Sequence, residues 1–308
     1  MIMDGARSLP TDPRPAGNTG VLRASLAGRA VACRTAPGGG SSHPRATVIA
    51  MSSLSLIEPD TALFLDFDGT LADLAPRPEL VRVEPELVAT LTTLHRWLDG
   101  ALAIISGRPV AELDHFLQPL RLPAAGVHGA EFRNIGEHLI TPPSPDISLL
   151  MPQLEALVRR HPGLRLEDKT IAVAIHYRQA PELEPLVRAA VADVLRDATG
   201  LEALPGKMVV EIKPAGVDKG GAIASFMRMP PFAGRRPVFA GDDVTDEAGF
   251  AVVGELGGTG VLVGQRASAA SVSVTGPAAL RDWLHRSARA ASVSVQDIDS
   301  GSTPSHRL

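Results

Sequence analysis

Short, unbroken apolar runs alternate with segments of helical periodicity between residues 59 and 290. The runs T-A-L-F-L-D-F, A-L-A-I-I-S, A-A-G-V, P-V-F-A-G and T-G-V-L-V-G have the length and composition of buried strands. The segments E-P-E-L-V-A-T-L-T-T-L-H-R-W-L, P-V-A-E-L-D-H-F-L and K-G-G-A-I-A-S-F-M favour helices. This alternation is typical of a parallel sheet covered by helices. The pattern therefore predicts an α/β fold with a doubly wound, Rossmann-like parallel sheet.

Residues 145–213 differ from the flanking sequence in the elements that their pattern predicts. They predict a helix, a strand pair, a second helix and a further strand, M-V-V-E-I-K, and T-I-A-V-A-I-H has an antiparallel character. The Pro-rich stretch T-P-P-S-P precedes this region and P-A-G follows it. We interpret 145–213 as an α+β cap domain inserted into a catalytic core that comprises 59–144 and 214–290.

The two ends of the chain lack periodicity. Residues 1–58 are rich in Gly, Pro, Ser, Ala and Arg, which predicts a disordered tail. A flexible tail, or a start assigned too early with Met51 as the true initiator, is the favoured explanation. An Arg-rich organelle transit peptide is the alternative, and a secretory signal is disfavoured because no continuous apolar region follows a basic start. The Ser-rich segment 291–308 predicts a second disordered tail.

Composition narrows the class of protein. The 308 residues are 44% hydrophobic and 21% charged, as in soluble globular proteins. A net charge of -4 gives no electrostatic reason to expect nucleic acid or an anionic membrane as partner. Cys33 is the single cysteine, which excludes an intramolecular disulfide and a cysteine metal site and fits a reducing compartment. We expect a cytoplasmic monomer that acts on a small molecule.

Two aspartates follow the first predicted strand. Asp66 and Asp68 stand at positions i and i+2, so both project to the same side at the strand's carboxyl end, the edge where parallel α/β sheets bind ligands. Gly69 then gives a sharp turn, and Thr70 offers a hydroxyl and an amide. Adjacent carboxylates repel each other unless a cation lies between them, and Mg²⁺ prefers such oxygen ligands. An acidic turn or cap is the structural alternative, but D-x-D-G-T after an apolar run is too particular for it.

A second acid cluster ends a later strand. In P-V-F-A-G-D-D-V-T-D-E, Asp242, Asp243, Asp246 and Glu247 follow Gly241, and so many carboxylates need a cation or solvent. A solvated loop that caps a helix explains this cluster equally well when it is considered alone. The presence of Asp66 and Asp68 favours the metal interpretation.

A hydroxyl and a lysine occupy comparable positions. Ser106 ends the second predicted strand, where its hydroxyl and the amides of Gly107 and Arg108 could hold phosphate oxygens. Lys219 precedes a helix amino terminus, which is a natural site for an anion. Each feature alone is weak, since a plain turn and a solvated lysine are common.

These motifs in this order resemble the haloacid dehalogenase superfamily of phosphotransferases. The resemblance implies a nucleophilic Asp66 that accepts the phosphoryl group, and Asp68 as general acid and then general base. It also implies that Mg²⁺ binds Asp66, the Asp68 carbonyl and Asp242, while Asp243 and Asp246 order its water shell. Lys219 and Ser106 would hold the phosphate oxygens.

Further stretches resemble the bacterial trehalose-6-phosphate phosphatases, over about residues 62–284. These are D-F-D-G-T-L-A-D-L-A-P-R-P, A-G-V-H-G-A-E, L-E-D-K-T-I-A-V-A-I-H-Y-R-Q-A-P and V-V-E-I-K-P-A-G-V-D-K-G. The resemblance implies hydrolysis of trehalose 6-phosphate, the final step of trehalose biosynthesis. It carries the sugar-binding groups of the cap over to Glu167, Lys169 and Glu211, although Glu167 and Lys169 could instead pair with each other.

On the core side we expect V-H-G-A-E to line the cleft that faces the cap. His128 is interpreted as a packing or hydroxyl-binding residue, with Gly129 and Glu131 beside it. Arg108 reaches either the phosphate, the sugar or the surface. His176 and Tyr177 are interpreted as structural.

Three other functions compete with this interpretation. A phosphatase for sucrose phosphate or mannosylglycerate phosphate would share the core and differ in the cap. A phospho-acceptor receiver domain also combines acids, a hydroxyl and a lysine, but it lacks a cap and an acid cluster after the lysine. A non-catalytic trehalose-phosphate sensor would require lost catalytic positions, whereas here every one is filled.

Overall fold

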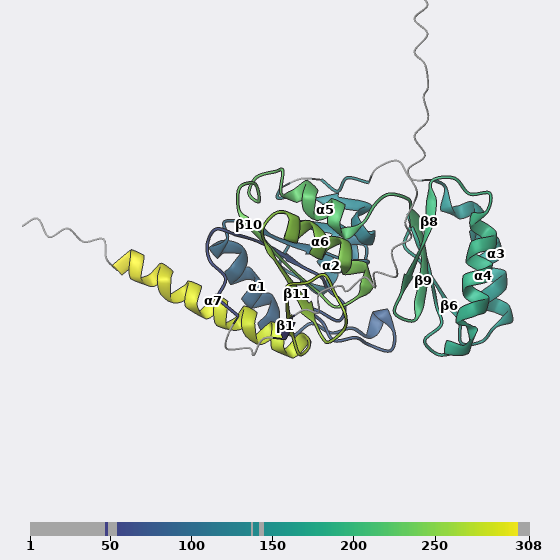
Figure 1. Ribbon diagram of the computed structural model, residues 1–308, viewed down its shortest axis with the longest axis horizontal. Coiled ribbons are helices and arrows are strands. Elements are labelled where there is room, and N and C mark those ends of the chain that lie inside the picture. The colour runs from purple at the N-terminus through teal and green to yellow at the C-terminus, as the bar shows by residue number, and fades with distance from the viewer. Residues whose placement is uncertain (1–46, 49–53, 137, 142–144, 301–308) are drawn as a thin grey trace, which may run out of the picture. The chain divides into compact units, whose positions relative to one another are not determined.

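A computed structural model of the protein describes residues 47–48, 54–136, 138–141 and 145–300 (Figure 1). These residues all belong to one compact unit of the chain. The predictions for 1–46, for Met51 and for 301–308 concern positions outside the described residues. No helix in the described part of the chain is long and apolar enough to cross a membrane.

The larger sheet contains eight strands in the order β1-β12-β11-β10-β2-β3-β4-β5. Neighbouring strands are parallel, except that β5 runs antiparallel to β4. The strands are β1 (Thr47–Val48), β2 (Thr61–Leu65), β3 (Leu102–Ile105), β4 (Ala124–Gly126), β5 (Glu131–Arg133), β10 (Arg236–Gly241), β11 (Thr259–Val263) and β12 (Val272–Val274).

Helices cover this sheet in pairs, because their apolar stripes need a partner. Helix α1 packs against α7 and α5 packs against α6, while α2 contacts β4. Phe64 of β2 stacks on Phe232 and also contacts Phe226, which anchors the central strand in the core. The helices are α1 (Pro85–Trp97), α2 (Val110–Phe116), α5 (Lys219–Phe226), α6 (Glu247–Glu255) and α7 (Pro277–Ser300). The predicted doubly wound α/β fold is confirmed.

The strand order creates a switch point at the centre of the sheet. From β2 the chain proceeds through β3 to β4 on one side, whereas β10, β11 and β12 follow one another on the other side. Parallel α/β sheets bind ligands at the carboxyl ends of the strands beside such a switch. Asp66 follows β2, Asp242 follows β10 and Ser106 follows β3, so the topology brings all three to that edge.

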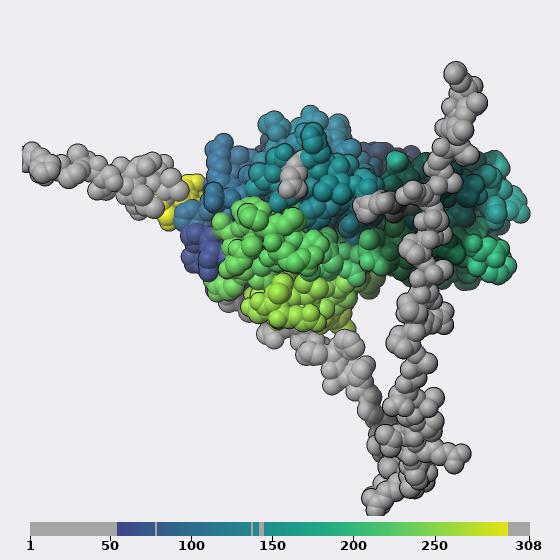
Figure 2. All heavy atoms as spheres, turned by 90° about the horizontal axis from the view of Figure 1, so that it is seen from above, coloured from purple at the N-terminus to yellow at the C-terminus, as the bar shows by residue number. Residues whose placement is uncertain are grey.

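Residues 147–214 form a second sheet with its own helices and hydrophobic core. The antiparallel order is β6-β7-β9-β8, and Leu154, Val187 and Ile212 belong to the separate core cluster beneath it. Figure 2 shows the residues of this region grouped together. The elements are η4 (Ile147–Leu149), α3 (Met151–Arg160), β6 (Arg165–Asp168), β7 (Val173–His176), η5 (Pro181–Leu183), α4 (Glu184–Leu195), β8 (Leu201–Gly206) and β9 (Val209–Pro214).

Strand β8 was not predicted from the sequence. It contains Pro205 and ends at Gly206, residues that weaken the strand pattern, and it lies at the edge of the sheet, where a proline is tolerated.

Both ends of the described chain are more ordered than the sequence predicts. Ile57 is buried, and its carbonyl accepts a hydrogen bond from Trp97 Nε1, while the carbonyl of Ser55 accepts one from Trp283 Nε1. Helix α7 continues ten residues beyond the predicted end of the core at 290, to Ser300. Buried indole N–H groups need acceptors, and a segment without internal periodicity supplies them here.

Candidate active site

A cleft of about 600 Å³ lies between the strand ends of the core and the open face of the cap sheet. Alternation along the cap strands decides which side chains face it. The cap residues that line the cleft include Glu167, His176, Leu204, Val209 and Glu211. Their neighbours in sequence, which include Leu166, Ile175, Val210 and Ile212, pack into the cap core instead. Asp66, Asp68, Ser106, Lys219 and Asp242 line the cleft from the core side.

Asp66 is buried at the end of β2, held between two side chains. Its Oδ1 lies 2.7 Å from Lys219 Nζ, and its Oδ2 accepts a hydrogen bond of 3.1 Å from the hydroxyl of Thr70. Lys219 begins α5 and is also buried, so its ammonium is fixed between Asp66 and Asp246, whose Oδ1 lies 2.7 Å away. These contacts hold the Asp66 carboxylate in one orientation toward the cleft.

Asp66, Asp242 and Asp246 form a cluster that suits a cation. One oxygen from each carboxylate lies within 4.8 Å of the others. Gly69 makes the close approach of Asp242 possible, because its φ is +80° and a Cβ there would lie 2.3 Å from Asp242 Oδ2. Three carboxylates around the single ammonium of Lys219 leave an excess of negative charge. A divalent cation with oxygen ligands would cancel it.

The pKa values of the cluster reflect the same repulsion. Burial raises the pKa of the Asp66 carboxyl well above its usual value, and the charges of Asp246 and Asp242 add to this while Lys219 opposes it. Burial, Asp246 and Asp243 raise the pKa of Asp242 to about 7. Although burial alone lowers the pKa of Lys219, the charges of Asp246 and Asp66 hold it above its usual value. We therefore treat Lys219 as charged and the acid cluster as incompletely neutralised.

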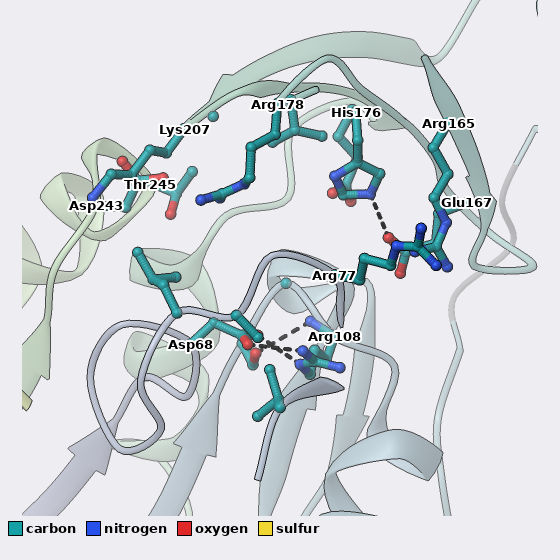
Figure 3. A pocket seen from close by; sticks show the side chains of 18 of the residues that line it. Asp68, Arg77, Arg108, Arg165, Glu167, His176, Arg178, Lys207, Asp243 and Thr245 are labelled. Carbon is teal, nitrogen blue, oxygen red and sulfur yellow. Dashed lines mark hydrogen bonds and ion pairs between the residues drawn. The ribbon is translucent and has the colours of Figure 1, made fainter. Parts of the chain in front are cut away.

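Asp68 is oriented by an arginine of the next strand end. Arg108 donates from Nε to Asp68 Oδ2 at 2.6 Å and from its NH2 group to Oδ1 at 2.8 Å (Figure 3). Arg108 is buried, which excludes the predicted surface alternative. The Asp68–Arg108 pair could not be predicted from the sequence, since forty residues separate the two.

The turn after β3 fixes Ser106 and Gly107. The Ser106 hydroxyl accepts a hydrogen bond of 3.2 Å from the Arg108 amide, and the residue is buried beside the cleft. A Cβ at Gly107 would lie 2.6 Å from His128 Nε2, so only glycine lets the turn approach that ring. Ser106, Gly107 and Arg108 therefore line the cleft together at the end of β3.

Lys169, Glu211 and His128 join the cap to the core. Lys169 Nζ lies 2.7 Å from Glu211 Oε2 and donates at 2.9 Å to the carbonyl of Gly107. His128 Nε2 lies 3.4 Å from the same Glu211 oxygen. Although burial alone raises the pKa of Glu211, Lys169 and His128 lower it to about 2. Glu211 Oε1 and His128 Nδ1 are buried without a hydrogen-bond partner among the described residues.

Glu167 does not pair with Lys169, the alternative left open by the sequence. Its Oε2 accepts a hydrogen bond from His176, whose Nε2 lies 2.6 Å away (Figure 3). His176 lines the cleft and is therefore not merely a structural residue of the cap. The alternation of His176 and Arg178 around the buried Tyr177 could have indicated that both face the cleft.

Glu131, Gly129 and Asp243 are placed differently from the prediction. Glu131 is not among the residues that line the cleft, because its Oε2 accepts a hydrogen bond of 2.6 Å from the amide of Val110 at the start of α2. Gly129 faces the carbonyl of Asp218, which a Cβ would approach to 2.8 Å. Asp243 lines the cleft, but its side chain caps η6 (Val244–Asp246), so that Asp246 and not Asp243 joins the acid cluster.

The cleft also contains basic residues that were not predicted. Arg178 and Lys207 of the cap and Arg77 of the core line it, and Figure 3 shows Arg178 pointing into it. They lie outside the motifs at the strand ends; strand alternation could have indicated Arg178, whereas no periodic pattern singles out Arg77 or Lys207.

Removing the charge of Asp242 should change how stability depends on pH. The pKa of Asp242 is about 7 in the folded protein and 3.8 ordinarily, so the folded state binds this proton more tightly than the unfolded state does. The contribution of Asp242 to the free energy of unfolding therefore falls as pH rises from about 4 to about 7. In EDTA, Asp242→Asn should therefore stabilise the protein more at pH 8 than at pH 5. The urea midpoints of both proteins at the two pH values measure this.

Asp60→Asn is the control, since it removes one carboxylate at an exposed position. An added divalent cation should raise the urea midpoint of the unchanged protein and have little effect on Asp242→Asn. If the urea midpoints of Asp242→Asn and the unchanged protein differed by the same amount at pH 5 and at pH 8, the raised pKa of Asp242 in the acid cluster would be contradicted.

Comparison with known proteins identifies the family. The chain matches the trehalose-phosphatase family model over residues 64–281. Trehalose-6-phosphate phosphatase of Escherichia coli (strain K12) is 45% identical over 225 residues, which cover 72% of this chain and 85% of that protein. A probable trehalose-phosphate phosphatase of Sinorhizobium fredii (strain NBRC 101917 / NGR234) is 44% identical over 238 residues, which cover 75% and 89%. The crystal structure of a trehalose-6-phosphate phosphatase related protein, 28% identical, superposes with a TM-score of 0.65 and covers 76% of this chain and 99% of that one. The chain therefore belongs to the trehalose-phosphatase family.

Proposed function

We propose that the protein hydrolyses trehalose 6-phosphate to trehalose and phosphate, the final step of trehalose biosynthesis, with Mg²⁺ as cofactor. The observation that carries this proposal is the meeting of two sets of groups in one cleft. The core contributes Asp66 with its lysine and carboxylate neighbours, and the cap contributes Glu211 and Lys169. The first set suits a phosphate ester and the second suits sugar hydroxyls.

Asp66 and Asp68 divide the chemistry between them. A carboxylate oxygen of Asp66 attacks phosphorus, the bond from phosphorus to the sugar oxygen breaks, and Asp68 donates a proton to that oxygen. Water then attacks the aspartyl-phosphate, Asp68 accepts a proton from the water, and the bond between phosphorus and Asp66 breaks. The fixed orientation of Asp66 between Lys219 and Thr70 supports its role as nucleophile.

The acid cluster would hold the cation. Asp66, Asp242 and the main-chain carbonyl of Asp68 are the proposed ligands, and Mg²⁺ bound there would neutralise charge on the phosphoryl oxygens. The resemblance implied that Asp246 only orders the water shell of the cation. Its carboxylate instead belongs to the acid cluster itself, together with Asp66 and Asp242. Its contact with Lys219 keeps that ammonium directed at the reacting carboxylate.

The phosphate oxygens would be held by groups at the strand ends. Lys219 would supply positive charge, while the Ser106 hydroxyl and the amide of Gly107 would supply neutral donors. Positioning and electrostatic stabilisation of this kind account for most of the catalysis in phosphoryl transfer.

The cap would recognise the disaccharide. Glu211 Oε1 is a buried acceptor without a partner in the described structure, and sugar hydroxyls are suitable donors. Lys169, Glu167 and His128 would add contacts around it. Since Lys169 also bonds to Gly107 of the core, substrate binding at the cap and closure over Asp66 would occur together, which limits bulk water at the phosphate.

A panel of phosphate esters tests the substrate. With Mg²⁺, kcat/KM for trehalose 6-phosphate should exceed that for glucose 6-phosphate by about 10²-fold, because the second glucose unit contributes binding energy in the transition state. Sucrose 6-phosphate and mannosylglycerate phosphate test the other disaccharide-like substrates. Comparable values across the panel would refute the assignment of the cap while preserving the phosphatase chemistry, and binding of trehalose 6-phosphate without phosphate release would indicate a sensor.

Neutralising Glu211 should impair recognition of the sugar. Glu211→Gln should lower kcat/KM for trehalose 6-phosphate by about 10- to 100-fold, the value of one or two hydrogen bonds to a charged group, and leave p-nitrophenyl phosphate hydrolysis nearly unchanged. Glu155→Gln is the matched control, since Glu155 is an exposed glutamate of the cap on α3. An equal loss on both substrates would show that Glu211 supports the fold of the site and not sugar binding.

A further inference from the structure

The guanidinium of Arg108 is already bound by several side chains of the protein. Besides both oxygens of Asp68, it binds Glu112 Oε2 at 2.8 Å through its NH1 group. Its guanidinium carbon lies 4.9 Å from the ring centroid of Phe116 and 5.7 Å from that of Phe67. The arginine is therefore held by aromatic contacts on its plane and by carboxylates at its edge, at a buried position.

Asp68, by contrast, depends on this arginine for its orientation. The hydrogen bonds described for its carboxylate both come from Arg108. Its side chain retains 31% exposure, compared with 7% for Arg108, and it lines the cleft. A bidentate contact with a planar guanidinium fixes the plane of a carboxylate as well as its position.

We propose that Arg108 is the positioning residue for the proton transfers of Asp68. Phe67 and Phe116 hold the guanidinium, Glu112 fixes its far edge, and the bidentate contact aims the Asp68 carboxylate at the reacting ester. The proton moves only between Asp68 and the leaving oxygen, and then between the attacking water and Asp68. This inference rests on the proposed acid–base role of Asp68 and replaces direct contact of Arg108 with phosphate or sugar.

The dependence of rate on the leaving group provides the test. Proton donation matters most for a poor leaving group such as a sugar alcohol and least for p-nitrophenol. Arg108→Met should lower kcat/KM for trehalose 6-phosphate by about 10- to 100-fold and for p-nitrophenyl phosphate by less than about threefold, within the range of general acid catalysis. Across a series of substituted phenyl phosphates, the logarithm of kcat/KM for Arg108→Met should fall more steeply with the pKa of the leaving phenol than it does for the unchanged protein. Asp68→Asn should show the same steeper dependence.

A double-mutant cycle separates positioning from substrate contact. In the Asp68→Asn background, Arg108→Met should cause less than about a twofold further loss, because the group that it positions is already inactive. If Arg108 bound the substrate itself, the second substitution would retain its full effect and raise KM. That outcome would overturn the inference.

Arg133 offers a matched control for the loss of a buried arginine. It is buried like Arg108 and makes two contacts of 2.6 Å with Asp114, outside the cleft. Arg133→Met should lower thermal stability without changing the leaving-group dependence. Arg108→Lys is the second variant, for use if Arg108→Met does not fold. It keeps the charge, so it should fold, but lysine cannot form the bidentate contact, so the leaving-group dependence should still be steeper than in the unchanged protein.

The two proposals fail in different ways. If Asp68→Asn leaves the leaving-group dependence unchanged, the acid role of Asp68 is wrong and the inference about Arg108 falls with it. If Asp68→Asn steepens the dependence while Arg108→Met and Arg108→Lys do not, the mechanism stands and only the inference is overturned.

Discussion

Asp66→Asn is expected to abolish phosphate release while leaving a folded protein. The amide cannot attack phosphorus, and loss of a covalent nucleophile lowers kcat by at least about 10⁴-fold in comparable enzymes. The fold should survive because asparagine has nearly the same shape and removes one of three mutually repelling carboxylates. Lys219 retains its contact with Asp246, so no buried charge is left alone.

Phosphate release from trehalose 6-phosphate and thermal unfolding, both with Mg²⁺, measure these two effects. Asp60→Asn is the matched control, because Asp60 precedes the same strand, is exposed and pairs with Arg236 at 3.2 Å. It should retain nearly full activity. Substantial turnover by Asp66→Asn in a preparation free of other phosphatases would disprove the role of Asp66 as nucleophile.

Lys219→Met should be costly for both stability and activity. Removing the ammonium leaves Asp66 and Asp246 buried without their cation, and breaking a buried ion pair in this way costs about 3–5 kcal/mol in the free energy of unfolding. Phosphate release should fall by about 10²- to 10³-fold, the usual effect of losing one charge-stabilising group. Because the acid cluster becomes more negative, Mg²⁺ should raise the unfolding temperature of this variant more than that of the unchanged protein.

Lys213→Met provides a comparison at an equally buried lysine. Lys213 pairs with Glu202 and with the carbonyl of Val217, where the cap rejoins the core. Its loss should also destabilise the protein, but the increase in unfolding temperature on addition of Mg²⁺ should equal that of the unchanged protein. Equal responses in Lys213→Met and Lys219→Met would argue against a special connection between Lys219 and the metal cluster.

Local patterns in the sequence determined the fold class and most of the candidate site. Continuous apolar runs are required of strands buried on both faces, and those runs end at Asp66, Ser106 and Asp242. Because parallel strands end at a common edge, the sequence could bring these side chains together without coordinates. Lys219 followed from its position at the start of a helix, although its contact with two carboxylates did not.

Only the tertiary structure decided how the charged groups pair. Asp68 with Arg108, Lys169 with Glu211, and Glu167 with His176 each join residues between 9 and 42 positions apart. Sequence spacing specifies which face of a strand a side chain occupies, but not which charge from another strand lies opposite. The pairing depends on strand register and on the docking of cap and core, which are set by packing of the whole chain.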